Sequence, residues 1–298
     1  MKNLRIPLLV ALGVAILGII LGSFFDLKLS ESIASASNGL GLALSAIGPT
    51  IGFAGMAVIG GGFIRFAIKG DYPKPLKLVF LVIAAGCLLV AILYSYGEYF
   101  GQNGFYGKAP KWVGLFIVIL PETGAMVGGY FLFRDCQNKN MWIVFMIILT
   151  VLFIAMVVAI PSLKALMHRP RYRLIVASSV EFHNWWEPCK NYKELMEITG
   201  STSENFKSYP SGHTTEASIL LASSSFLPLA NNKFKKYQPL LFTISSILIV
   251  IVGFARILAA AHFLSDVSTG ATIVILLTVI ANEVIIRIKP LHIENQGI

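Results

Sequence analysis

Long apolar stretches separated by short polar segments dominate the pattern of this chain. Eight stretches meet or approach the roughly 20 apolar residues that a helix needs to cross about 30 Å of hydrocarbon. They lie near residues 6–25, 43–68, 78–97, 112–133, 141–161, 212–230, 237–257 and 267–288. The pattern predicts eight membrane-spanning helices. The first stretch has an apolar run longer than the usual roughly 7–15 residues of a signal peptide, so we expect it to be a retained membrane anchor.

Composition supports the same class of protein. The chain is 56% hydrophobic and only 13% charged, with a mean hydropathy of +0.74, whereas a soluble domain is roughly 45–50% apolar and 25% charged. We therefore expect an all-α polytopic transmembrane bundle. The net charge of +9 does not point to nucleic acid, because basic residues in a membrane protein first report its orientation. Cys87, Cys136 and Cys189 lie in three different kinds of segment, so a disulfide framework is not expected.

Most basic residues fall in alternate segments of the predicted topology. Such segments are expected to be cytoplasmic, because Lys and Arg accumulate in short cytoplasmic loops. The residues of this set are Lys2, Arg5, Arg65, Lys69, Lys74, Lys77, Arg134, Lys139, Lys233, Lys235, Lys236, Arg287 and Lys289. The short loops of the opposite set, 26–42 and 98–111, contain Lys28, Lys108 and Lys111. This pattern fits an even number of spans with both termini in the cytoplasm, and the expected location is a bacterial cell membrane.

A second group of basic residues lies on the predicted outer side, against this rule. Its members are Lys164, Arg169, Arg171, Arg173, Lys190, Lys193 and Lys207 in the outer segment 162–211, and Arg256 at the end of the seventh span. Basic residues are disfavoured on the outer side of a membrane protein. A cluster of them there indicates that they bind an anionic ligand. Lys190 and Lys193 are expected only to be solvated, and Arg169 and Arg173 to contact lipid headgroups.

Two further patterns concern packing. The polar stretch 179–210 contains Trp185 and Trp186, which allow it to lie at the membrane interface as an amphipathic lid; an ordinary loop is the alternative. Small residues let helix backbones approach closely, and the glycines that predict such packing in the first half of the chain are Gly61, Gly62, Gly124, Gly128 and Gly129.

Three short clusters at the outer ends of spans contain the residue types that phosphoryl transfer needs. They run from Lys164 to Arg171 (KALMHRPR), from Tyr209 to His213 (YPSGH), and from Arg256 through His262 to Asp266. Positive charge stabilises the oxygens of a transferring phosphoryl group. Arg171 can donate two parallel hydrogen bonds to such a group and Lys164 one, although Lys164 could instead belong to a basic girdle at the headgroups.

The second and third clusters predict a helix start and a nucleophile. Ser211 and Gly212 are expected to open a helix whose N–H groups face a phosphate, with His213 in its first turn as general acid; a simple Ser cap with a solvated histidine is the alternative. His262 and Asp266 are four residues apart, so on a helix they share a face. Asp266 could then orient one imidazole nitrogen while the other attacks phosphorus. A plain interfacial pair is the alternative.

Together these clusters resemble the type 2 phosphatidic acid phosphatase superfamily, which also includes vanadium haloperoxidases. The motifs of that family are K-x6-RP, PSGH and SR-x5-H-x3-D, and the resemblance covers roughly residues 78–288. The resemblance implies that His262 is the nucleophile, Asp266 its orienting partner and His213 the acid. The residues that it implies for phosphate binding are Lys164, Arg171, Ser211, Gly212 and Arg256.

Two positions depart from the family motifs. Tyr172 stands where the first motif has proline, and Ala255 where the third has serine. Arg169-Pro170 also reads as RP, so the identity of the first-motif arginine stays open between Arg169 and Arg171. The resemblance divides the chain into a two-span extension, residues 1–76, and a six-span phosphatase core, residues 77–298, with the outer loop 162–211.

The expected function is hydrolysis of a lipid phosphate or diphosphate at the extracytoplasmic face, through a phosphohistidine and without metal or cofactor. The substrate classes are an undecaprenyl diphosphate or a phospholipid phosphate, and membrane lipids are the other expected partners. The sequence does not predict an oligomeric state. A lipid phosphotransferase with the same His and Asp pair is the alternative, and a transporter without chemistry is a more distant one because the basic residues lie at span ends.

Overall fold

The computed structural model describes residues 4–45, 47–100, 111–136, 140–230 and 233–288, and within these ranges the regular structure is helical. The long helices are α1 (Arg5–Ile33), α3 (Ile47–Lys69), α4 (Lys74–Phe100), α5 (Lys111–Leu132), α6 (Met141–Phe153), α10 (Gly212–Ala230), α11 (Lys233–Leu258) and α12 (Leu264–Arg287). The shorter ones are α2 (Gly39–Ser45), the π-helical turn η2 (Ile154–Ala159), α7 (Ile160–Met167), α8 (Tyr172–Ala177), α9 (Tyr192–Thr199) and the 3₁₀ turn η3 (Ser203–Phe206).

All eight predicted spans form helices, which confirms the all-α polytopic bundle. Among the described residues, six helical segments are long and apolar enough to cross a membrane. The other two predicted spans are shorter or more polar. The described apolar part of α5 is Phe116–Leu132, and α10 carries polar side chains on successive turns, including Thr214, Thr215 and Ser218.

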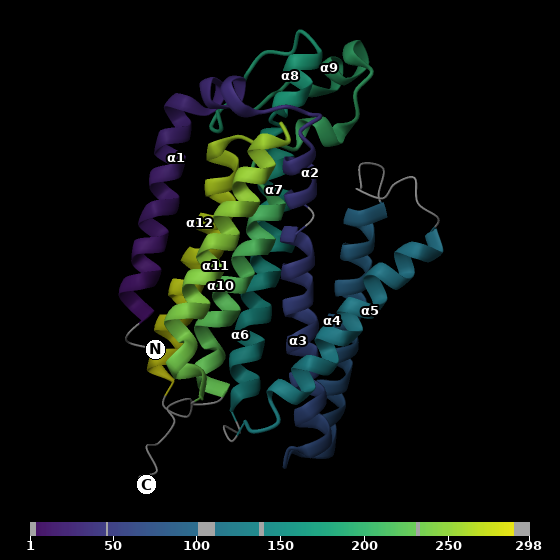
Figure 1. Ribbon diagram of the computed structural model, residues 1–298, viewed down its shortest axis with the longest axis vertical. Helices are drawn as coiled ribbons and strands as arrows, with labels where there is room; N and C mark the ends of the chain where they lie inside the picture. Colours follow the sequence, from purple (N-terminus) through teal and green to yellow (C-terminus); the bar gives the residue numbers. More distant parts are fainter. Residues whose placement is uncertain (1–3, 46, 101–110, 137–139, 231–232, 289–298) are drawn as a thin grey trace.

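The helices form a bundle around α10 (Figure 1). α10 packs against α11, α12 and α3, while α1 packs along α12. α3 also packs against α4 and α5, which lie to one side of the bundle in Figure 1. The predicted division of the chain at residue 76 stays a prediction, but α1 and α3 both pack directly on helices that carry the predicted site.

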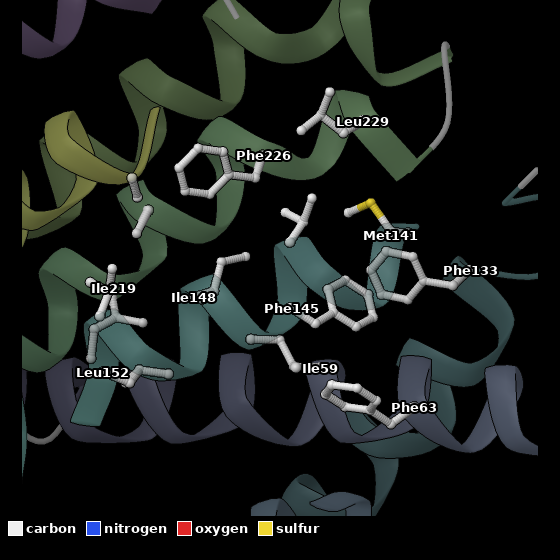
Figure 2. Packing of buried hydrophobic residues seen from close by; sticks show 14 of the residues in the cluster. Ile59, Phe63, Phe133, Met141, Phe145, Ile148, Leu152, Ile219, Phe226 and Leu229 are labelled. Atoms are coloured by element: carbon white, nitrogen blue, oxygen red, sulfur yellow. The ribbon is translucent and has the colours of Figure 1, made fainter. Parts of the chain in front are cut away.

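An apolar cluster joins α3, α6 and α10 (Figure 2). Phe145 of α6 lies at its centre, with its ring centroid 4.7 Å from that of Phe133 and 5.5 Å from that of Phe63. Phe226 of α10 is fully buried in the same cluster. Because lipid tails are as apolar as these side chains, close packing rather than escape from water holds the helices together.

Close backbone contact between α3 and α5 requires glycine. A Cβ atom added at Gly61 would lie 1.9 Å from the carbonyl oxygen of Met126, and one at Gly129 would lie 2.1 Å from that of Val58. Gly62 is also closely packed, whereas Gly124 and Gly128 would meet nothing within 4 Å. The predicted close packing is confirmed for Gly61, Gly62 and Gly129 and is wrong for Gly124 and Gly128.

The segments between α7 and α10 form a folded cap over one end of the bundle (Figure 1). The cap has its own small core, in which Leu174, Val180, Cys189 and Phe206 are buried. The indole N–H of Trp185 donates to the Ser23 hydroxyl of α1 at 2.9 Å. The segment between α7 and α10 is therefore not an ordinary loop, and it is tied to the bundle.

Candidate active site

The three predicted clusters meet beneath this cap. Lys164 lies in α7, which continues the long helix α6 through the π-helical turn η2. Such π turns often occur near functional sites, and Pro161 at the start of α7 lacks the N–H that would complete an α-helical ladder. A Cβ atom at Gly212 would lie 3.7 Å from Lys164 Nζ. The amide of Ser211 donates to the Asp266 carbonyl at 3.0 Å, which joins the second cluster to the third.

α10 begins at Gly212, as the sequence predicts. Ser211 is fully buried, and its hydroxyl bonds to the Thr214 side chain at 3.1 Å. His213 is partly exposed in the first turn of α10, and buried Glu216 follows one turn later. His213 lies in the first turn of α10, where backbone N–H groups lack intrahelical partners.

The imidazole of His262 is buried, and its proton position follows from its contacts. Nδ1 lies 2.6 Å from the carbonyl oxygen of Ser208. A carbonyl only accepts hydrogen bonds, so Nδ1 carries the hydrogen and Nε2 keeps the lone pair. Burial lowers the pKa of His262 well below its ordinary value, while Asp266 acts to raise it and Arg171 to lower it. The ring is therefore neutral at neutral pH, as a nucleophile must be.

The turn between α11 and α12 places His262. α11 ends at Leu258, and the amides of Ala261 and His262 both donate to the carbonyl oxygen of Arg256, at 3.1 and 3.2 Å. Ala260 takes the left-handed conformation, with φ of 53°. This tight reversal explains the Arg-x5-His spacing, because it folds His262 back beside the end of the helix that carries Arg256.

Asp266 lies beside the imidazole and also holds it through neighbouring residues. Its carboxylate lies 3.7 Å from His262 Nδ1, while Ser208 supplies the carbonyl that holds this nitrogen. The Ser208 hydroxyl donates to Asp266 Oδ2, and so does the amide of Phe263 at 2.8 Å, which caps α12. Asp266 thus fixes Ser208 and the start of α12, and these in turn fix the imidazole.

The two candidate arginines of the first motif have different environments. Arg169 is 1% exposed and donates to Asp266 at 2.6 Å and to Asp26 at 2.9 Å. The expectation that Arg169 contacts lipid headgroups is therefore wrong, because buried carboxylates engage its guanidinium. With Arg169 committed in this way, Arg171 is the better placed of the two to bind phosphate.

Arg171 interacts with charged residues of the cap. Its Nε donates to the Glu204 carbonyl at 2.8 Å, and its Nη2 lies 4.0 Å from the Glu204 carboxylate. Burial alone would raise the pKa of Glu204, but Lys207, 2.6 Å away, with Arg171 and Lys164 brings this pKa below its ordinary value. Arg171 and Arg256 interact electrostatically with each other and with His262. Two of the predicted phosphate-binding cations, Arg171 and Arg256, thus lie close enough to the predicted nucleophile to act on its charge.

The family model that matches this chain is that of the PAP2 superfamily, over residues 139–288. The chain belongs to the PAP2 superfamily. This confirms the resemblance to type 2 phosphatidic acid phosphatases, and the match runs from the start of α6 to the end of α12, across all three motifs. Comparison with curated proteins and with solved structures found no match. The PAP2 match and the apolar helices indicate a multi-pass membrane protein of phosphatase type.

Several residues at the site escaped sequence analysis. The Ser208 carbonyl is a backbone group and leaves no mark on the sequence. Asp26 has a signal in the sequence, since an acidic residue toward the end of an apolar span is a functional candidate by default. Glu204 lies in the polar stretch between α9 and α10, where an acidic residue is not unusual. Among the described residues, no three His, Cys, Asp or Glu side chains gather as metal ligands would, and metal-free chemistry stays a prediction.

Proposed function

We propose that this PAP2 protein hydrolyses lipid phosphates or diphosphates through a phosphohistidine at His262. The observation that carries this proposal is the hydrogen bond from His262 Nδ1 to the Ser208 carbonyl, which directs the lone pair to Nε2. The positive charges of Arg171 and Arg256 act on the same ring. A neutral imidazole next to two cations is suited to attack an anionic phosphoryl group, because the ring keeps its lone pair and the cations offset the negative charge.

In the first step, the Nε2 lone pair forms a bond to phosphorus while the bond from phosphorus to the leaving oxygen breaks. His213 donates a proton to that oxygen. Arg171, Arg256 and Lys164 neutralise the phosphoryl oxygens, and backbone N–H groups at the start of α10 add hydrogen bonds. The phosphorylated imidazole keeps its hydrogen on Nδ1, which the Ser208 carbonyl continues to accept.

In the second step, water attacks the same phosphorus atom. His213, now neutral, takes a proton from the water as the P–N bond breaks, and the electron pair returns to Nε2. Inorganic phosphate leaves and the starting protonation states return. His213 therefore acts as acid and then as base, in the manner of other two-step transfers.

The position of the site at the end of a membrane bundle supports a proposal for the substrate class. His262 lies in the turn between two candidate spans, of which the first ends at Leu258 and the second begins at Leu264. A phosphate that reaches this level while its chain stays in the bilayer must belong to an amphiphile. We assign a polyprenyl diphosphate, such as undecaprenyl diphosphate, or a phospholipid phosphate, at the extracytoplasmic face; preference for the former rests on family analogy.

Trapping of the intermediate tests this mechanism. Native chain, His213→Ala and His262→Ala are mixed with lipid labelled in the scissile phosphoryl group and quenched in alkali, which preserves a P–N bond. The native chain should carry label on the protein during turnover, and His262→Ala should carry none. His213→Ala should both gain and lose the label more slowly than the native chain, because His213 is the acid of the first step and the base of the second. Label that persists in His262→Ala would contradict the assignment. Transfer of label to an added alcohol in preference to water would favour the phosphotransferase.

A further inference from the structure

α1 contributes a buried carboxylate to the end of the bundle where His262 lies. Asp26 is 2% exposed, and its Oδ1 accepts a hydrogen bond from the backbone N–H of Ser265 at 2.9 Å. Its Oδ2 accepts from the Ser265 hydroxyl and from Arg169 Nη2 at 2.9 Å. These contacts join a helix outside the PAP2 match to the first turn of α12.

The hydrogen-bond directions show that Asp26 is ionised. Arg169 Nη1 donates to the Ser265 hydroxyl at 2.8 Å, so that hydroxyl uses its own proton to donate to Asp26. Both carboxylate oxygens of Asp26 thus accept from N–H or O–H donors. A guanidinium, which has no acceptor and stays charged, fixes the direction of the whole chain.

Arg169 connects Asp26 to the residue that braces the nucleophile. Its Nη1 also donates to Asp266 Oδ1 at 2.6 Å, and its Nε donates to the His183 carbonyl at 2.8 Å. The guanidinium carbon lies 4.3 Å from the centroid of the Phe263 ring. The guanidinium is therefore held on its edges and on one face, and two carboxylates share its charge.

The charge of this group matters for the reaction. Two carboxylates and one guanidinium sum to −1, and Asp266 lies 3.7 Å from His262 Nδ1. Phosphorylation at Nε2 makes the imidazole cationic, beside the positive charges of Arg171 and Arg256. Without Asp26, Arg169 would neutralise Asp266 alone, and the group would offer the cationic ring no net negative charge.

We propose that Asp26 is a positioning residue for the reaction at His262, acting through Arg169 and Asp266. The first helix is then part of the active site rather than only an anchor. This inference rests on the proposed function. Asp26 acts on the charge and orientation of the Asp266 carboxylate and does not touch the phosphate, so its loss changes the chemical step and not the binding of substrate.

The test compares kcat and KM for phosphate release by the native chain and Asp26→Asn. The expected result is a fall in kcat on the order of 10-fold, the lower end of what the loss of an outer-shell partner costs a site, with KM within about twofold of native. Matched controls are Glu31→Gln, an exposed carboxylate farther along α1, and Arg5→Gln, which removes the ion pair with Glu283 at the other end of the α1–α12 contact. Both controls should keep native kcat.

A second variant separates charge from packing. Asp26→Asn with Arg169→Gln leaves Asp266 as the only charge, so the group again carries −1, and kcat should rise above that of Asp26→Asn alone. A purely structural role predicts a further loss. If Asp26→Asn does not purify as folded protein, the double variant is measured alone: turnover supports the proposal and loss of turnover overturns it. If neither variant folds, Asp26 is needed only for packing, and the proposal is overturned.

The outcomes distinguish this inference from the proposed function. Phosphate release by the native chain with unchanged kcat in Asp26→Asn overturns only the role of Asp26. No release by the native chain from any lipid phosphate overturns the proposed function itself.

Discussion

At the scale of single residues, reactivity depends on which nitrogen of His262 holds its hydrogen. The Ser208 carbonyl fixes that hydrogen on Nδ1, and burial keeps the ring neutral. Both effects come from neighbours that fold against the turn after α11, so in the proposed mechanism the histidine is oriented for attack before any substrate binds. This preorganisation is the usual source of much of the rate enhancement of enzymes.

The pH dependence of activity follows from the depressed pKa of His262. A neutral imidazole attacks and a protonated one does not, so kcat/KM should fall with decreasing pH only below the ordinary histidine pKa of about 6.5. The same sign applies to stability. Between the two pKa values the unfolded state binds a proton at His262 and the folded state does not. The contribution of His262 to the free energy of unfolding is therefore complete above about pH 6.5 and is lost as pH falls through the lower, folded-state pKa.

Initial rates from about pH 5 to 9 and thermal unfolding at the same pH values measure both effects. An acid limb that belongs to His262 and lies above about pH 7 would contradict the account. His213→Ala provides the comparison, because it removes the proposed acid and base in the first turn of α10 and should leave the His262 limb in place in whatever rate remains.

Glu204 should weaken phosphate binding in the native chain. Its ionised carboxylate lies beside Arg171 and Lys207, where it competes with an incoming phosphate. Glu204→Gln should therefore lower both KM and the inhibition constant of inorganic phosphate, by about 1.4- to 5-fold for an exposed pair worth about 0.2–1 kcal/mol. Glu197→Gln, an exposed carboxylate on α9, is the control. A higher KM in Glu204→Gln alone would show that Glu204 assists binding.

Spacing in the sequence predicts the motif residues, since Lys164, Ser211 and His262 fall at the ends of helices that converge. Side-chain spacing carries no information about the Ser208 carbonyl. The sequence could not decide whether Arg169 or Arg171 is the first-motif arginine, because both follow α7. The structure distinguishes them, since Arg169 is buried between the carboxylates of Asp26 and Asp266.

At the scale of helices, close packing of α3 on α5 depends on particular glycines. Gly129→Ala should destabilise the bundle by about 1–3 kcal/mol, because the new methyl group would meet the Val58 carbonyl and force the helices apart. The neighbouring Gly128→Ala meets nothing within 4 Å and should be neutral or stabilising by up to about 1 kcal/mol, since alanine favours a helix. Thermal unfolding in detergent compares the two, and equal effects would contradict the packing.

Apolar length predicts the spans well, because a helix is the structure that satisfies its backbone within lipid. The cap is harder to predict. Its small core is built from residues scattered over Leu174 to Phe206, and the hydrogen bonds that join it to the bundle use backbone groups, such as the Arg173 amide, which donates to the Ala260 carbonyl between α11 and α12 at 3.0 Å. Neither leaves a periodic pattern in the sequence.

At the scale of the whole molecule, the charge pattern predicts that the cap lies outside the cell and the opposite end of the bundle lies in the cytoplasm. Cys136 lies between α5 and α6, and α6 begins at the end of the bundle away from α8 and α9 (Figure 1). A membrane-impermeant maleimide should label Lys193→Cys, exposed on α9, in intact cells. It should reach Cys136 only after permeabilisation. The reverse pattern would contradict the predicted orientation.

The central claim, a histidine phosphatase that acts on lipid phosphates, is tested most directly by phosphate release in detergent. Native chain, His262→Ala and His168→Asn are compared on polyprenyl diphosphate, phosphatidylglycerol phosphate and phosphatidic acid in the presence of EDTA. His168 is the control histidine, because it stacks on Tyr192 of the cap with 3.6 Å between ring centroids. The account predicts release by the native chain and by His168→Asn, unaffected by EDTA, and none by His262→Ala. No release from any lipid, or release that survives the loss of His262, would contradict it.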